Sequence, residues 1–409
     1  MIKRSAWAVL DQGLFAGANF IANLLLARWM TPEEYGVFTV LFALLLLVGT
    51  MHSAFWIEPM LVYGKKKFNT ELPRYLSFVA GNGFLATSFA ALILVASGIV
   101  ISFIDDTISI GMMLPLLLAV PVILTMWLLR RACFVCDQPR LAVIGATLYA
   151  LLVLLGVSSF KFNEILSVHS IFILLAVISL IVGAFFMKAL AMTTQPSVDS
   201  IYVKDVSALH MNYGRWGLWV GLLIWVLGNF YFVVLAYFDS AASAGALRAV
   251  WNLYMPLLHA FAAISVAVIP LLAEKEGAHS GGIRLVLIIA LSVSFSYLVV
   301  LAIFSDPILN LLYDQKYSGQ TQVVIGLGLM TMAYGIIAMY STILRAREKM
   351  KSLFRAYSVG GAITLFIGSI VTIKYGVSGA AISMAAIYSI VAMLLIQDVG
   401  KEKKAANIT

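Results

Sequence analysis

The segment DQGLFAGANFIANLLLARWMTPEEYG, residues 11–36, decides how the chain folds. Up to Arg28 it is an apolar run of helical length. The turn Thr31–Gly36 then separates this run from a second apolar run that starts at Val37. Two apolar runs joined by a short polar turn predict a hairpin of two membrane helices.

Four polar residues interrupt the first of these helices. Asp11, Gln12, Asn19 and Asn23 fall within an arc of about 120° when successive residues turn by 100°. A helix face in contact with lipid does not carry such a stripe, because unpaired polar groups are costly in hydrocarbon. We therefore expect the stripe to face protein or water.

The composition extends the membrane interpretation to the whole chain. Of the 409 residues, 62% are hydrophobic and only 11% are charged, and the mean hydropathy is +1.00. A soluble core of this size cannot hide so much apolar surface. The net charge of +8 is then better explained by membrane topology than by nucleic-acid binding. Met1–Arg4 resembles the start of a signal peptide, but Asp11 interrupts the apolar run, so we expect the first helix to be retained.

A bilayer-spanning helix needs about 20 apolar residues, and this criterion predicts twelve spans and an all-α polytopic membrane protein. The spans run over about 5–27, 36–62, 75–103, 112–130, 141–160, 167–188, 213–237, 246–272, 285–304, 319–344, 355–373 and 377–397.

Lys and Arg are distributed unequally between the loops on the two sides of the membrane. One side carries 21 of the 27, and Arg215 and Arg248 lie within or at the edge of spans. The other side carries four, namely Arg28, Lys161, Lys316 and Lys374. The positive-inside rule therefore predicts cytoplasmic N- and C-termini.

The predicted domains are two six-helix lobes, residues 1–188 and 213–400. A polar cytoplasmic linker, 189–212, joins them, and a basic cytoplasmic tail, 401–409, follows.

The two lobes carry related motifs. Arg130, Arg140 and Gly145 repeat 215 residues later as the set Arg345, Arg355 and Gly360. Because six spans are an even number, both lobes cross the membrane in the same orientation and form a parallel repeat. Parallel repeats are typical of transporters in which two bundles rock around a central cavity.

Several motifs resemble those of bacterial polysaccharide flippases. The run Leu26–Gly36 is similar to their opening, and Ala244–Ala249 to the start of their eighth helix. Ile308–Tyr317 resembles their ninth loop, although Asp314 stands where glycine is expected, and Tyr375–Ala381 resembles their last hairpin. These flippases are the O-antigen and exopolysaccharide exporters (Wzx type) of the multidrug/oligosaccharidyl-lipid/polysaccharide exporter superfamily.

The resemblance implies a fold, an activity and a substrate. The fold has twelve helices in two lobes that form a V around a central cavity. The activity is alternating access, and the substrate is an oligosaccharide on undecaprenyl diphosphate, turned from the inner to the outer leaflet. Polymerase and glycosyltransferases of the same pathway are the expected partners, besides membrane lipids.

Such a substrate requires cations for its diphosphate, because buried phosphate charge without partners is prohibitive. Arginine suits this role, since its planar fork meets two phosphate oxygens at once. The candidates are Arg28, Arg215 and Arg248, and Arg248 is the strongest because it lies beyond the loop. The alternative for each is that it extends to the nearest lipid headgroups.

Polar residues within the spans are further candidates. Asn19 and Asn229 are predicted to line the path, and their alternative role is to join helices. Asp11 and Glu58 are candidates for ion coupling by H⁺ or Na⁺. For Asp11 the alternative is a structural ion pair, for example with Arg215, and for Glu58 it is a solvated helix end.

Histidines, aromatic residues and cysteines complete the inventory. His52 and His259 are placed near mid-depth as pH sensors or interior groups, and aromatic residues such as Trp216 as sugar platforms or packing groups. Cys133 and Cys136 lack further ligands for zinc, so no metal is expected. No phosphate-binding loop for ATP and no nucleophile with its base occur, which argues against an enzyme.

Three other functions compete with the flippase. A multidrug antiporter of the same superfamily needs an acidic cavity, whereas the charges predicted to be buried here are mixed. A scaffold that holds glycan-assembly enzymes without transporting anything needs neither Asp11 nor Arg248. A membrane ligase or polymerase would need a larger outer loop than Ser305–Gly319.

Overall fold

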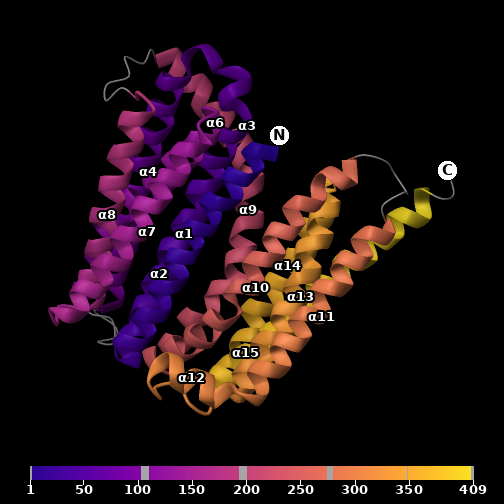
Figure 1. Ribbon diagram of the computed structural model, residues 1–409. Helices are drawn as coiled ribbons and strands as arrows, with labels where there is room; N and C mark the ends of the chain where they lie inside the picture. Colours follow the sequence, from indigo (N-terminus) through magenta and orange to yellow (C-terminus); the bar gives the residue numbers. More distant parts are fainter. Residues whose placement is uncertain (1, 103–109, 193–199, 274–279, 348, 407–409) are drawn as a thin grey trace. The chain divides into compact units, whose positions relative to one another are not determined.

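The computed structural model describes residues 2–102, 110–192, 200–273, 280–347 and 349–406, and these residues form helices joined by short turns (Figure 1). The helices are α1 (Ile2–Trp29), α2 (Pro32–His52), η1 (Ser53–Ile57), α3 (Glu58–Lys67), η2 (Asn69–Glu71), α4 (Leu72–Ser102), α5 (Ile110–Met113), α6 (Pro115–Val135), α7 (Pro139–Phe162), α8 (Val168–Ala189), α9 (Ser200–Phe238), α10 (Ala241–Ala273), α11 (Ser280–Ile303), α12 (Ser305–Tyr313), α13 (Thr321–Ala346), α14 (Met350–Ile363), η3 (Thr364–Gly368) and α15 (Ser369–Ala406).

The all-α polytopic fold predicted from the sequence is confirmed. Within the described ranges, ten helical stretches are long and apolar enough to cross a membrane. One of them, Met350–Lys401, contains the last two predicted spans, which a non-helical Gly376 (φ 58°, ψ −140°) separates. The predicted span 246–272 lies in α10, which is not among the ten.

The structure adds features that hydropathy did not predict. The helix α9 begins at Ser200, so the second part of the predicted linker is helical, while residues 193–199 lie outside the described residues. The short helix α12 occupies the predicted outer loop. Single π-helical turns, η1 and η3, interrupt two of the long helices.

The turn between α1 and α2 is built as the sequence of residues 31–36 dictates. The Thr31 hydroxyl accepts from the Glu34 amide at 3.2 Å, and the Glu34 carboxylate accepts from the Thr31 amide at 3.2 Å. This reciprocal pair is a capping box, and Pro32 fits the first helical position because its missing N–H would be unpaired there. The capping box therefore fixes where α2 starts.

Close backbone packing follows at Gly36. A Cβ added to this residue would lie 1.7 Å from the carbonyl oxygen of Ala241, where α10 begins. At Gly245, one turn further along α10, an added Cβ would lie 2.7 Å from the carbonyl oxygen of Pro32. The first hairpin therefore packs on the start of α10 through two glycines.

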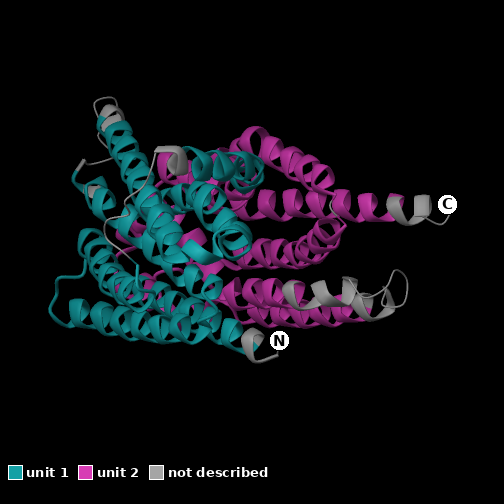
Figure 2. Cartoon of the chain, turned by 90° about the horizontal axis from the view of Figure 1, so that it is seen from above, with its two compact units in different colours: residues 1–26, 41–222 teal, residues 27–40, 223–409 magenta. Residues whose placement is uncertain are grey.

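The chain forms two compact units, shown in different colours in Figure 2. Unit 1 comprises residues 1–26 and 41–222, and unit 2 comprises residues 27–40 and 223–409. In unit 1, α6 packs against α3, α4, α7 and α8. In unit 2, α13 packs against α10, α11, α14 and α15. The helices α6 and α13 have the largest buried shares among the candidate spans, 72% and 61%. They are the fourth and tenth predicted spans, which hold matching places in the two predicted lobes.

Candidate functional site

In unit 1 the carboxylate of Asp11 pairs with Arg130. The Nε of Arg130 lies 3.0 Å from one carboxylate oxygen of Asp11 and 3.2 Å from the other. Asp11 is fully buried and Arg130 is 4% exposed. The sequence placed Asp11 on the buried stripe but named Arg215 as its example of a partner. The structure gives it Arg130 instead.

The rest of the guanidinium is also held by α1. Its Nη2 donates to Gln12 Oε1 at 3.0 Å, and its Cζ lies 3.9 Å from the centroid of the Phe15 ring. Sequence reasoning missed Arg130 because it counted this residue as a loop cation. In the structure α6 continues to Val135, so Arg130 lies more than one turn inside the helix.

Further along α1, the polar side chains of the stripe form hydrogen bonds within the protein. The side-chain amide of Asn19 donates to the Phe15 carbonyl at 2.8 Å, and its oxygen accepts from the Tyr149 hydroxyl at 3.0 Å. The Asn23 amide donates to the Asn19 carbonyl at 2.9 Å. In this structure Asn19 joins α1 to α7, which is the helix-joining role that the sequence left open.

The interior of unit 1 nevertheless keeps unsatisfied polar atoms. In the described part of the chain, Asn23 Oδ1, Thr125 Oγ1 and Trp127 Nε1 are buried without a hydrogen-bond partner. One oxygen of the Asp11 carboxylate likewise has only the electrostatic contact to Arg130. Buried groups of this kind are costly, and these four lie on α1 and α6.

In unit 2 Arg248 lies in an aromatic and hydroxyl-rich environment. It is 8% exposed, and its Cζ lies 5.8 Å from the centroid of the Phe232 ring. The Tyr35 hydroxyl is within hydrogen-bonding reach of Arg248 and also accepts from the Asn252 amide at 2.9 Å. Arg248 is therefore a buried cation near the start of α10, as the sequence suggested.

Arg28 binds the end of a helix. Its Nη1 donates to the Leu311 carbonyl at 2.8 Å, at the end of α12. In return Lys316 Nζ donates to the carbonyls of Arg28 and Met30 at 2.6 and 2.8 Å, at the end of α1. Arg28 thus caps the C-terminus of α12, and Lys316, in the turn that follows α12, caps the C-terminus of α1, where carbonyls are unpaired and the helix dipole is negative.

The remaining candidates lie on α9 and α3. Arg215 is exposed on α9, beside the ring of Trp216 at 6.0 Å. Asn229 is half-buried on the same helix, in unit 2. Glu58 is exposed at the start of α3, where a Cβ added to Gly217 would lie 3.3 Å from its carboxylate.

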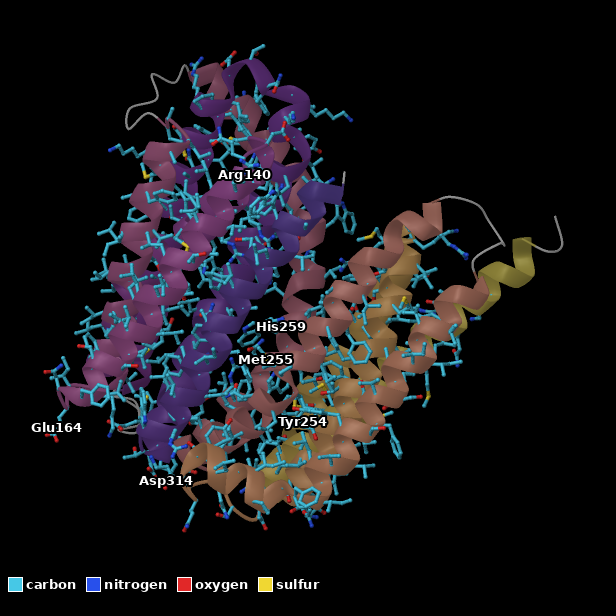
Figure 3. All side chains as sticks on the ribbon, viewed as in Figure 1. Arg140, Glu164, Tyr254, Met255, His259 and Asp314 are labelled. Atoms are coloured by element: carbon cyan, nitrogen blue, oxygen red, sulfur yellow. The ribbon has the colours of Figure 1, made fainter. Side chains whose placement is uncertain are left out.

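The two predicted histidines differ in burial. His52 is 1% exposed and stacks on Trp56, and neither of its ring nitrogens has a hydrogen-bond partner among the described residues. His259 is exposed on α10, the helix that also carries Tyr254 and Met255 (Figure 3).

Both cysteines are free thiols. Burial raises the pKa of Cys136, which lies in the turn between α6 and α7, so its thiol is little ionised near neutral pH. Within the described ranges no group of three His, Cys, Asp or Glu side chains is placed to hold a metal ion.

Comparisons with known proteins identify the fold. No family model matches the chain, and no curated protein matches it. The lipid II flippase MurJ in an inward closed conformation superposes with a TM-score of 0.71 at 18% identity, covering 98% of this chain and 88% of MurJ. An inward-facing multidrug resistance MATE family transporter of the MOP superfamily gives 0.72 at 11% identity, covering 97% and 96%.

A third solved structure has the same fold. A MOP superfamily transporter from Pyrococcus furiosus, described as having a binding pocket of reverse polarity, gives a TM-score of 0.67 at 12% identity, covering 99% of this chain and 97% of that one. The chain is thus a multi-pass membrane protein with the fold of MOP superfamily transporters. The comparisons bear out the superfamily fold and leave the Wzx type as a prediction.

Proposed function

We propose that this protein is a flippase for an oligosaccharide linked to undecaprenyl diphosphate, such as an O-antigen, capsule or exopolysaccharide repeat unit. It would turn the substrate from the inner to the outer leaflet of the bacterial inner membrane by alternating access. The lipid II flippase with the same fold supports a lipid-linked substrate, and the motif resemblance supports a glycan-assembly pathway with polymerase and glycosyltransferase partners.

The observation that carries the proposal is that the buried carboxylates are already paired with arginines. The buried charged side chains of the described residues are Asp11, Asp398, Arg130 and Arg248. Both acids form ion pairs with arginine, Asp11 with Arg130 and Asp398 with Arg355. Each buried carboxylate therefore already has an arginine as its counter-charge, whereas a cationic cargo would need a carboxylate of its own, so these buried charges suit an anionic cargo better than a cationic one.

Within this proposal Arg248 contacts the diphosphate and Asp11 couples transport to an ion gradient. The guanidinium of Arg130 already lies against the Asp11 carboxylate, and its positive charge would repel Na⁺ from the same oxygens. We therefore favour a proton over sodium. Uptake of a proton by Asp11 would remove the counter-charge of Arg130 and free its guanidinium.

A multidrug antiporter is the second candidate. The MATE transporter with the same fold along 97% of this chain supports it as directly as MurJ supports the flippase. An antiporter requires a carboxylate that can release its arginine partner and bind a cationic drug instead. Asp11, which is paired with Arg130, is the candidate for this role.

The test is deletion of the gene, followed by measurement of undecaprenyl-diphosphate-linked oligosaccharide on the inner leaflet and of drug susceptibility. We expect the glycolipid to accumulate and wild type to clear it. Arg248→Ala should clear it at least about tenfold more slowly, since it removes one charged contact. The control Arg345→Ala, an exposed arginine on α13, should behave as wild type at equal membrane levels. Unchanged glycolipid with raised drug susceptibility would instead identify the antiporter.

A further inference from the structure

Unit 1 contains a cavity of about 370 Å³ between η1, α4 and α9. Most of its lining is apolar, with aromatic side chains from Phe55, Trp56 and Phe78. Leu85 and Met211 also line it, and they are 67% and 54% exposed. The cavity therefore reaches a surface of exposed apolar side chains, which in a membrane protein is the surface that contacts lipid.

The polar groups that line the cavity form hydrogen bonds with other groups of the protein. In a regular helix the Phe55 carbonyl would accept from the N–H of residue 59, but Pro59 has no N–H. His210 satisfies this carbonyl with its Nδ1 at 2.8 Å, and its Nε2 lies 2.8 Å from the Tyr75 hydroxyl.

The carbonyl can only accept, so Nδ1 of His210 carries the proton and Nε2 accepts from Tyr75. Both nitrogens are then used. The side-chain amide of Asn82, another lining residue, donates to the Phe78 carbonyl at 2.9 Å. The cavity thus offers a ligand mainly apolar contacts.

Cations lie at one end of the cavity. Arg74 precedes Phe78 by one turn of α4 and shares its face, and Lys204 precedes Ser207 and Met211 on one face of α9. At 1.5 Å per residue, the Cα atoms of both residues lie within about 6 Å of the cavity lining along their helix axes. Lys204 is exposed, and Arg74 is half-buried in an ion pair with Glu71 at 3.2 Å. Beyond the other end, α4 continues with apolar residues such as Phe89.

We infer that this cavity holds the prenyl segment next to the diphosphate of a lipid-linked cargo, with Arg74 and Lys204 at the level of the diphosphate. An apolar cavity with cations at one end matches an amphiphile that has one long chain and an anionic head. The volume lies at the low end of ligand pockets and suits one chain better than the two chains of a phospholipid. This inference rests on the proposed function and adds where the cargo's tail is held.

The test uses the full-length purified protein and a polyprenyl diphosphate that carries a photoreactive group near the head. We expect the label on peptides of η1, α4 and α9. Ala86→Trp fills the cavity and should reduce labelling at least about tenfold. Ala90→Trp, one turn further on the same helix and outside the lining, should not. Met211→Trp narrows the mouth from an exposed position and should also reduce labelling, whether or not Ala86→Trp folds.

The head is tested separately. Lys204→Gln should weaken labelling by the diphosphate probe several-fold, while labelling by the matching prenyl alcohol stays unchanged. Label spread over other helices, or labelling that neither tryptophan reduces, would overturn the inference. So would a phospholipid probe that labels the same peptides and is not displaced by polyprenyl diphosphate.

Failure of this inference and failure of the proposed function give different results. If gene deletion causes the glycolipid to accumulate but the probe does not label the cavity, only the tail site is wrong. If the probe labels the cavity but deletion causes no accumulation, the flippase assignment is wrong and the binding site stands.

Discussion

At the scale of single residues, the ion pair between Asp11 and Arg130 is the feature that most constrains the candidate site. Removing two charges from water costs several kcal/mol for each ion, and their attraction repays this only with good geometry. Here the geometry is good, since Arg130 also bonds Gln12 and stacks on Phe15. A pair held in this way is structural in the resting protein, even if proton uptake breaks it during transport.

Removing one partner of this pair should destabilise the protein more than removing both. Asp11→Asn leaves Arg130 buried without its counter-charge and should cost about 3–5 kcal/mol, measured as a lower melting temperature of the purified protein. Asp11→Asn combined with Arg130→Gln should recover most of that loss. The control Arg131→Gln changes an exposed neighbour and should leave stability unchanged. A single variant, Asp11→Asn, with wild-type stability but no export would show instead that the carboxylate serves coupling alone.

At the scale of elements, Arg28 and Lys316 act as a matched pair of helix caps. Since Arg28 caps the end of α12 and Lys316 caps the end of α1, Arg28→Gln and Lys316→Gln should lower stability by similar amounts, about 1 kcal/mol each. If Arg28 also binds cargo, as the sequence led us to expect, Arg28→Gln should slow glycolipid clearance far more than Lys316→Gln does. Equal clearance by the two variants at equal membrane levels would leave Arg28 with the capping role only.

The packing of the first hairpin on the start of α10 depends on Gly36. Gly36→Ala would place a methyl group 1.7 Å from the backbone oxygen of Ala241, and backbone cannot move aside as a flexible side chain can. We expect a loss of several kcal/mol, visible as a reduced membrane level and a lower melting temperature. Gly13→Ala and Gly17→Ala are matched controls on α1, because an added Cβ there meets nothing within 4 Å. Wild-type behaviour of Gly36→Ala would contradict this close packing.

At the scale of the whole molecule, hydropathy predicted the helices because a span must be long and apolar whatever its neighbours are. Thus α6 and α13 were found within a few residues of their observed bounds. Structural features that depend on contacts between residues far apart in the sequence were not predicted. The bond from His210 to the Phe55 carbonyl depends on where α9 packs. The partner of Asp11 depends on where α6 packs.

The same division applies to the candidate site. The sequence identified Asp11 and Arg248 because a charge within an apolar run is visible without a structure. It could not identify Arg130, because a charge at the predicted end of a span reads equally well as a loop cation. The predicted lobe boundaries at residues 189–212 remain a prediction. The two compact units are divided within α1, α2 and α9.

The unequal distribution of Lys and Arg predicts which side of the membrane each loop faces, and the positions of the helices alone do not give this. With Cys133 and Cys136 changed to serine, we expect single cysteines at Asn163 and Ser318, both exposed, to react with an impermeant maleimide on intact cells. Cysteines at the exposed positions Lys66 and Lys401 should react only after permeabilisation, because 21 of the 27 cations are predicted to lie on the cytoplasmic side.

The reverse labelling pattern would overturn more than the topology. It would place Arg74 and Lys204 at the outer leaflet, where a cargo made in the cytoplasm does not begin its passage. The cavity between η1, α4 and α9 would then face the product of transport and not its substrate. The labelling pattern therefore decides at which stage of transport that cavity acts. If it matches our expectation, both cations meet the diphosphate before it is flipped.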